Sequence, residues 1–540
     1  EGYPLWDRTT CGGGPGLADP ESLVLSSLFA GLFGVRGDVM GRWYPTIAMV
    51  LSVVGTYLYC RRGLLLGRVG SLWAGVVFIA SGFVVLQTSQ RMMFVPFLFM
   101  PWVLYLARAG EKHLLAACGA GVVLATMILE GGLLPLVETC VALLLVTAPR
   151  LLSRAHVRDA ARMLGIATVV CGLVAGVKLF PVMVQMLRWP SHVKGGLDGL
   201  KWPELMPILV DKERYDGLAG HGFHINEYRA YVGPAVLGCA IAGAGAALIL
   251  KPRRLGVAVL VLGGLLFMRG SYSPTAPYSL LFGVFSWNAL VVPSRFAVIA
   301  LLGIAVAGAV AIDAGLERVG KQRILAAVLL VVAFVAARDP IVEARKIFLV
   351  QGMEPWLPRS EVASGEYSIV AGGRMQELPA RHAGTLNCER ILDTPHATEL
   401  AIGNVPQAAP ESPDAGKLAS IVTSQNGYTF HAELSRFAVV HLNTSWDPDW
   451  TASVGTVRRA NNGQLDLALP AGPSDVVMRY SPRAFTSGLL CTITGLLLCL
   501  GVALWPLLAR RRRRSTQPAA SPPAPPSFAP GVNPGAPTAA

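Results

Sequence analysis

Eleven apolar segments separated by polar loops limit how this chain can fold. Hydrophobic residues make up 53% of its 540 residues and charged residues only 15%, whereas soluble globular proteins carry about 25% charged residues. This composition predicts an α-helical, multi-span membrane protein. The expected spans lie at 43–60, 69–86, 94–107, 114–130, 132–148, 163–186, 230–250, 255–268, 296–314, 323–337 and 485–509. Several are shorter than the roughly 20 residues that cross hydrocarbon, so we expect tilted or broken helices.

Basic residues follow one set of loops. The loops with more Lys and Arg than acids are 61–68, 108–113, 150–162, 251–254 and 317–323, and Arg510 to Arg514 follow the last span. The positive-inside rule places these loops and the C-terminus in the cytoplasm. It places 1–42, 187–229, 269–295 and 338–484 outside. The placement of the basic residues that give the net charge of +13 is thus explained by membrane orientation, and we expect no nucleic-acid partner.

The segments outside the spans divide the chain further. Residues 1–42 are expected to form an outer loop, in which 22–36 reads as a short interfacial or re-entrant helix. The multi-span domain covers 43–337, and 338–484 forms a separate β-rich domain. Strands are expected at 437–442, 451–459, 465–469 and 475–480, and Asn462-Gly463 is a strong hairpin signal. After the last span, 485–509, comes a basic stop and a Pro/Ala-rich disordered tail, 510–540.

Two of the nine cysteines, Cys11 and Cys388, lie in polar regions, and the other seven lie in apolar spans. A disulfide between Cys11 and Cys388 can form if both face an oxidising compartment. Two unpaired thiols are the interpretation we favour, because a sequence supplies no distance between them.

Charged residues gather in the outer loops and at the edges of the spans. Ionisable residues at these depths are costly and are functional candidates by default; within spans they are Arg91, Glu130, Glu138 and Lys178. Arg and Lys side chains can hold a phosphate or diphosphate, and a carboxylate can take the proton from an attacking hydroxyl. This pattern suits an enzyme that acts on an anionic lipid-linked substrate. The simpler interpretation is that outer loops of any membrane protein are polar and solvated, and that Glu138 and Lys178 pair inside the bundle.

No residues have convincing metal-ligand spacing. His221 and His224 form a short HGFH motif without an HExxH-like partner set, and ordinary hydrogen bonds are expected for them. The acids Asp211, Glu213 and Asp216 read as a solvated face rather than a cation site. We therefore expect no certain cofactor, and a requirement for a divalent metal stays open.

Four stretches together resemble the bacterial YfhO family of membrane proteins. They are PLWDRTTCGGGPGLADPES (4–22), SGFVVLQTSQRMMFVPFLFMPWVLYLA (81–107), VVPSRF (291–296) and SWDPDWTASVGTVRRANNGQLDLALPAGPSDVVMRYSPRAFTSG (445–488). The last is the most specific, because a Pro-x-Trp, an Asn-Gly turn and a Leu-Pro-x-Gly occur in the family's order.

The resemblance implies a GT-C-like glycosyltransferase of the bacterial inner membrane. Such enzymes transfer sugars with inversion from polyprenyl-phosphate donors to an envelope glycan or lipid on the outer face. In such enzymes an acid in the first outer loop, close to the end of the first span, is the general base. Here that span and its acid are expected upstream of Glu1, and Asp7 is the nearest acid that remains.

We expect Arg91, Arg229 and Arg295 to bind the donor phosphate. The residues expected to orient or deprotonate the acceptor are Asp7, Asp19 and Glu227. Trp446 and Trp450 are candidates for stacking on sugar rings, although core aromatics of a sandwich are the favoured interpretation. The alternative function is a non-catalytic transporter or assembly partner for lipid-linked sugars, for which inverted repeats and broken helices at the bilayer midplane are expected. A third alternative is a pseudo-enzyme that keeps only the fold.

Overall fold

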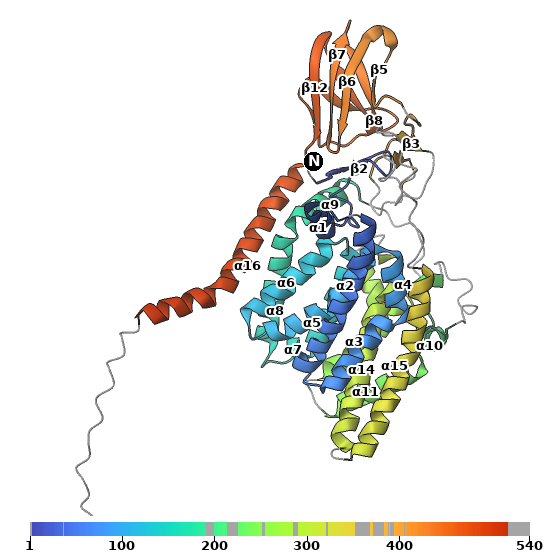
Figure 1. Cartoon of the computed structure of the whole chain (residues 1–540), viewed down its shortest axis with the longest axis vertical. Helices are drawn as coiled ribbons and strands as arrows, with labels where there is room; N and C mark the ends of the chain where they lie inside the picture. Colours follow the sequence, from blue (N-terminus) through green and yellow to red (C-terminus); the bar gives the residue numbers. More distant parts are fainter. Residues whose placement is uncertain are drawn as a thin grey trace, which may run out of the picture.

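A helical bundle carries a β-sandwich at one end (Figure 1). The computed structural model describes residues 3–35, 37–190, 199–212, 225–250, 254–284, 290–319, 322–351, 368–370, 383–386, 388, 394–403 and 405–516. The main helices of the bundle are α2 (Gly37–Leu58), α3 (Arg68–Ala80), α4 (Gly82–Gln90), α5 (Met100–Gly110), α6 (Leu114–Leu129), α7 (Leu133–Leu151), α8 (Val157–Val174), α9 (Gly176–Arg188), α11 (Pro234–Leu250), α12 (Leu255–Met268), α14 (Ala297–Val319) and α15 (Arg323–Gln351). A final helix, α16 (Arg483–Thr516), leads from the sandwich along the bundle.

All eleven expected spans are largely helical, but their number as membrane crossings is not confirmed. Six helices in the described chain are long and apolar enough to cross a membrane, or eight if two bent pairs each count as one span. Three further expected segments form shorter apolar helices, 114–129, 234–249 and 255–268. Helices of this length fall short of the roughly 20 residues that a crossing needs, so helix length alone does not identify them as crossings.

The two bent pairs confirm that some helices are broken. The angle is 52° between α3 and α4 and 83° between α8 and α9. At the second bend Gly176 lies against α16, where a Cβ would come within 2.9 Å of the Cβ of Cys491. A bend of this size needs a local interruption of the helix ladder, and glycine lets another helix approach it closely.

Helix α14 is the centre of the bundle. In the apolar 18-residue stretch of the span that contains it, Pro293–Val319, 94% is buried, and α11, α12 and α3 pack around it. Its surface is rich in Ala, Gly and Val, which lets helices approach closely. A Cβ on Gly243 of α11 would come within 1.7 Å of the carbonyl oxygen of Ala307. Tight small-residue contacts therefore hold these two backbones together.

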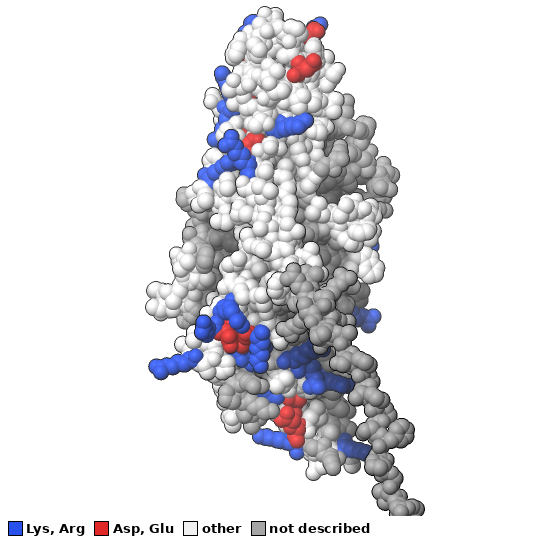
Figure 2. Space-filling model, turned by 90° about the vertical axis from the view of Figure 1, so that its left-hand side faces the viewer, with Lys and Arg blue, Asp and Glu red and all other residues white. Residues whose placement is uncertain are grey.

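Basic loops and outer loops lie at opposite ends of the bundle. Residues from four of the basic loops meet at one end: Leu64, Arg108 and Arg150 line a pocket with Gly256, and Arg254 pairs with Asp313 at 3.0 Å. The N-terminal loop meets the other end, where Leu23 bridges to Glu130. The visible face in Figure 2 has charged side chains at both ends and a mainly uncharged belt between them. This separation is the one that a membrane-spanning bundle requires.

The β-region is an antiparallel sandwich of two four-stranded sheets with the orders β10-β11-β8-β5 and β6-β7-β12-β9. The strands are β5 (Ala408–Pro410), β6 (Gly416–Ser424), β7 (Gly427–Leu434), β8 (Ala438–Ser445), β9 (Trp450–Ala452), β10 (Thr456–Arg459), β11 (Gln464–Leu469) and β12 (Gly472–Tyr480). Both sheets contribute to one core, with Val440 and Leu467 from one and Phe430 and Val476 from the other. The expected hairpin is confirmed, because β10 and β11 pair across Asn462-Gly463. The expected strand 451–459 is two strands, β9 and β10, interrupted at Gly455, whose φ is +84°.

The N-terminal segment belongs to the base of the sandwich. Its strands β1 (Trp6–Asp7) and β2 (Gly14–Pro15) pair with each other, and the Trp6 ring enters the sandwich core. Cys11 and Cys388 form a disulfide, so the two unpaired thiols that we favoured are wrong. Folding brings the Cα atoms within 4.4 Å although 377 positions separate them in sequence, and no local pattern encodes that approach.

Three boundaries differ from expectation. Helix α15 runs to Gln351 instead of ending at 337. Its charged extension is stabilised by ion pairs, since Asp339 contacts Lys212 and Glu343 contacts Arg229. Helix α16 extends to Thr516, and the tail beyond it lies outside the described residues. The short helix expected within 22–36 is α1 (Leu25–Phe33), with Leu32 81% exposed; this apolar exposure suits a helix at a membrane interface.

Candidate functional site

Charged and polar side chains from several parts of the chain gather at the sandwich end of the bundle. We call them the outer-end cluster, which consists of Asp19, Glu21, Gln87, Arg91, Glu130, Glu138, Lys178, Glu227 and Arg295. Local structure places them at the ends of elements. Arg91 follows α4, Glu227 lies in a short 3-10 helix, η4 (Ile225–Tyr228), and Arg295 lies in another, η7 (Pro293–Phe296), which leads into α14.

A buried ion pair between Glu227 and Arg295 forms the centre of the cluster. Arg295 donates to both carboxylate oxygens, from Nε at 2.9 Å and from an Nη at 2.7 Å. Gln87 donates to the same carboxylate at 3.3 Å. Burial alone would raise the pKa of Glu227, but the hydrogen bonds and charge of Arg295, with the charge of Arg91, outweigh it and lower the pKa. Glu227 is therefore a firmly ionised group that orients Arg295.

Arg91 is the more available cation of the two. Its guanidinium lies 3.6 Å from the Glu227 carboxylate, and its side chain is 52% exposed, against 10% for Arg295. The ring of Phe94 lies beneath both guanidinium groups, at 6.0 Å from Arg91 and 5.1 Å from Arg295. Contacts of this kind hold a cation in place without neutralising it. Arg91 can thus meet an incoming anion while Arg295 stays fixed behind it.

Glu138 lies behind the pair, on α7. Both of its carboxyl oxygens are buried without a hydrogen-bond partner among the described residues, and Arg295 and Glu227 act on it electrostatically. The expected pairing of Glu138 with Lys178 is not found. Lys178 instead donates to the backbone oxygen of Ser22.

The N-terminal loop supplies the other side of the cluster. Asp19 accepts a hydrogen bond from the backbone N–H of Glu21 at 2.9 Å, and the adjacent Ser22 is held by Lys178. Glu130 accepts from the backbone N–H of Ser26 at 2.7 Å, in the first turn of α1. A carboxylate at that position satisfies a free backbone donor at the start of the helix. The loop and α1 are therefore fixed onto the end of the bundle.

Glu21 lies half-buried beside a second acid, Asp19. Burial and the neighbouring Asp19 raise its pKa to about 7, although Arg91, Arg295 and Lys178 act to lower it. Its carboxylate has no hydrogen-bond partner within the described part of the chain, so it is free to accept a proton. A carboxyl group with a pKa near the working pH is the kind of group that serves in general acid-base catalysis.

The structure brings four of the eight predicted site residues together: Asp19, Arg91, Glu227 and Arg295. Arg229 lies two residues beyond Glu227 but contacts Glu343 on α15 at 3.3 Å. Asp7 lies in the β1–β2 hairpin, where its carboxylate accepts from the hydroxyls of Thr9 and Thr10 at 2.6 and 2.9 Å.

The two predicted tryptophans belong to the sandwich. Trp450 is 3% exposed and packs edge-on against Trp6 at 5.2 Å, as the favoured interpretation of a core aromatic expects. Trp446 is half-buried, and Arg459 lies over its ring at 5.7 Å.

Sequence reasoning assigned no specific role to Glu21, Gln87, Glu138 or Lys178. The signal for Glu138 and Lys178 was present, because an ionisable residue inside an apolar segment is rarely accidental. For Glu21 and Gln87 there was none, since their chemistry depends on neighbours that the fold supplies.

The described residues contain no group of three or more His, Cys, Asp or Glu side chains that could hold a metal ion. His221, His224, Glu213 and Asp216 lie outside the described residues.

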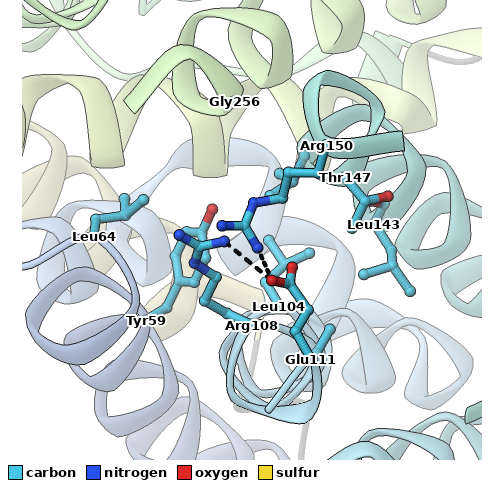
Figure 3. A pocket seen from close by; sticks show the side chains of 11 residues that line it. Tyr59, Leu64, Leu104, Arg108, Glu111, Leu143, Thr147, Arg150 and Gly256 are labelled. Carbon is cyan, nitrogen blue, oxygen red and sulfur yellow. Dashed lines mark hydrogen bonds and ion pairs between the residues drawn. The ribbon is translucent and has the colours of Figure 1, made fainter. Parts of the chain in front are cut away.

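A separate pocket lies at the basic end of the bundle (Figure 3). There the Glu111 carboxylate faces two guanidinium groups, those of Arg150 and, at 3.5 Å, of Arg108. Tyr59, Thr147 and apolar side chains complete the lining. Since the acid neutralises much of the positive charge, this arrangement ties the α5 and α7 ends together.

No family model and no curated protein matches the sequence of this chain. The cryo-EM structure of the arabinofuranosyltransferase AftD from Mycobacteria is similar to this chain, with 16% sequence identity and a TM-score of 0.48. The match covers 71% of this chain and 28% of that chain, so this chain spans less than a third of the length of AftD.

Proposed function

We propose that this chain is a membrane glycosyltransferase that moves a sugar from a polyprenyl-phosphate donor to an envelope glycan or lipid on the outer face of the bacterial inner membrane. One observation carries the proposal. Glu21, a half-buried carboxyl group with a pKa of about 7, lies among the cations Arg91, Arg295 and Lys178 at the end of an apolar bundle. The pairing of a poised base with anion-binding groups fits transfer from a phosphate-linked donor.

In this proposal Arg91 binds the donor phosphate directly. It is half-exposed and its ion pair with Glu227 is loose, at 3.6 Å, so it can exchange that contact for a phosphate oxygen. Arg295 adds positive charge from behind while its bidentate bond to Glu227 keeps it in place. Both groups stabilise the negative charge that grows on the leaving phosphate.

Glu21 acts as the general base in the transfer step. The acceptor hydroxyl oxygen attacks C1 of the sugar from the face opposite the phosphate, and its proton passes to the Glu21 carboxylate. The bond between C1 and the phosphate oxygen breaks, and its electron pair leaves with polyprenyl phosphate. The new bond forms with inversion at C1. Asp19 positions Glu21 by accepting its backbone N–H.

The variant Glu21→Gln tests this role. It keeps the size of the side chain but cannot accept the proton, and loss of a general base costs roughly 100- to 10,000-fold in rate. The measurement follows labelled sugar from polyprenyl-phosphate donors into envelope fractions in membranes that contain the protein. Glu433→Gln is the matched control, because Glu433 is an exposed carboxylate on the sandwich.

Two results would count against the proposal. Transfer by Glu21→Gln at the rate of the control would remove Glu21 from the chemistry. Absence of transfer by the unchanged protein from every donor tested, with normal expression, would contradict the enzyme itself.

A transporter of lipid-linked sugars is the second candidate, and the two broken helices favour it. Transporters place such breaks at the bilayer midplane, where the substrate binds. Here the charged groups instead gather at one end of the bundle, which favours the enzyme. Movement of labelled lipid-linked sugar across vesicle membranes without bond cleavage would support the transporter.

A further inference from the structure

A second basic feature lies at the end of the bundle opposite the outer-end cluster. An open hollow of about 530 Å³ is lined by Tyr57, Leu58, Arg61, Arg62, Leu65 and Arg68, and we call it the arginine groove. The six residues come from the end of α2, the π-helix η1 (Tyr59–Gly63), the turn after it and the start of α3. One short stretch of chain therefore forms the whole groove.

This stretch is anchored firmly from behind. The side chains of Tyr59, Cys60 and Leu66 are buried in the bundle core. The backbone N–H of Gly67 donates to the Asp313 carboxylate at 2.6 Å. Between these anchors Leu65 adopts a left-handed backbone conformation, with φ of +59°, which a non-glycine residue rarely adopts. The chain is thus held in a turn that displays the arginines at its edge.

The three arginines of the groove carry uncompensated charge. Arg61 donates to the backbone oxygen of Leu66 at 2.8 Å, and among the described residues none of the three forms an ion pair with a carboxylate. The pocket of Figure 3 differs, because there Glu111 lies between its two arginines. Three guanidinium groups around an open hollow form a site for an anion, and their planar forks fit phosphate oxygens.

The rest of the lining indicates the kind of anion. Leu65 is 59% exposed beside the arginines, and Leu58 and Tyr57 complete the wall. The apolar span Val39–Gly63 ends at the groove, so it lies where hydrocarbon gives way to headgroups. Basic pockets at the cytoplasmic ends of membrane helices bind anionic lipid headgroups. We propose that the arginine groove binds the headgroup phosphate of an anionic phospholipid, with Leu58 and Leu65 against its acyl chains.

The test measures binding of a fluorescent short-chain phosphatidylglycerol to the detergent-purified chain. One variant replaces Arg61, Arg62 and Arg68 with Gln. The matched control replaces Arg154, Arg158 and Arg318, which are exposed in other basic loops, with Gln. Each Arg close to the bound headgroup contributes enough attraction for roughly a fivefold change in affinity, whereas arginines farther away are screened. We therefore expect on the order of 100-fold weaker binding for the groove variant and less than about threefold for the control.

Further measurements distinguish binding at a specific site from nonspecific attraction by surface charge. A variant with Lys at 61, 62 and 68 keeps the charge but loses the planar forks, so we expect it to bind more weakly than the unchanged protein. Competition by phosphatidylglycerol but not by phosphatidylcholine supports the lipid site, and competition by inorganic phosphate at equal concentration would overturn the role of the acyl chains. Equal losses in the groove and control variants, or full binding by the Lys variant, would overturn the proposal. Circular dichroism checks that each variant is folded.

Discussion

At the scale of single residues, two acids of the outer-end cluster, Glu21 and Glu227, have opposite environments. Glu227 is held ionised by Arg295 and Arg91, and its pKa is lowered. The pKa of Glu21 is raised to about 7 by burial and by Asp19. Two carboxyl groups whose surroundings push their pKa values apart can take different roles at one pH. Glu227 therefore suits a fixed counter-charge, and Glu21 suits proton transfer.

Asp19→Asn should change the pH dependence of transfer. The base form of Glu21 is the deprotonated form, so in the proposed reaction we expect transfer by the unchanged protein to rise as the pH passes about 7. The Asp19 charge is one cause of the raised pKa, and its removal moves that rise to lower pH, toward the ordinary value of 4.5. The Asn side chain keeps an oxygen for the Glu21 N–H, so the loop is retained.

The measurement is the transfer rate from about pH 5 to about pH 9, in steps of roughly half a unit, which covers both sides of the expected rise. Asp159→Asn, at the exposed start of α8, is the control and should keep the original profile. An unchanged profile in Asp19→Asn would show that the titrating group is not Glu21.

At the scale of elements, a line of glycines joins α16 to the break between α8 and α9. A Cβ on Gly488 would lie 2.2 Å from the carbonyl oxygen of Gly176, and a Cβ on Gly495 would lie 2.8 Å from the Cβ of Leu173. The hydroxyl of Thr492 accepts from the N–H of Val177 at 2.9 Å, which is exposed by the break. Close glycine packing and this hydrogen bond let the helix below the sandwich stabilise a bent helix in the bundle.

Gly488→Ala should destabilise this contact between α16 and the α8–α9 break. The new methyl group meets backbone atoms that cannot rotate away, and overpacking of this kind costs about 1–3 kcal/mol. Thermal unfolding in detergent, followed by circular dichroism, should show a lower midpoint. Gly501→Ala is the matched control on the same helix, since a Cβ at that position would have no described atom within 4 Å. Equal midpoints for the two variants would show that the contact between α16 and the α8–α9 break does not limit stability.

At the scale of the whole molecule, the N-terminal segment connects the sandwich to the outer-end cluster. Trp6 packs in the sandwich core and donates from Nε1 to the Thr444 hydroxyl at 3.2 Å. The backbone of Gly12 accepts from the N–H of Ser445 at 2.8 Å. A few residues later the same segment supplies Asp19 and Glu21 to the cluster. The position of the sandwich therefore fixes the position of the proposed base.

Replacing Cys11 and Cys388 with Ser should loosen this connection. A disulfide that closes a long loop typically contributes about 2–4 kcal/mol by restricting the unfolded chain. We expect a lower midpoint for loss of tertiary structure, measured by near-ultraviolet circular dichroism of the core tryptophans. Cys499→Ser, which removes a half-buried free thiol, is the control. Labelling of Cys11 by a maleimide without reductant would contradict the disulfide directly.

Hydropathy and loop charge were enough to predict the helices, because the transfer of each side chain into hydrocarbon depends on that side chain and its near neighbours. The alternation around Asn462-Gly463 likewise predicted β11 and the β10–β11 hairpin. Strand β1 could not be predicted in this way, since Trp6 becomes a core residue only when 6–7 folds against the sandwich. The number of crossings also depends on bends and short helices that composition does not show.

The outer-end cluster was predictable only in part. Arg91, Arg295 and Glu227 could be singled out, because ionisable groups beside apolar segments are costly and rarely accidental. Their meeting depends on the folded chain, as do the Cys11–Cys388 pair and the pKa of Glu21. Each of these properties arises from distances and burial between segments far apart in sequence, and the physics that sets them acts through space.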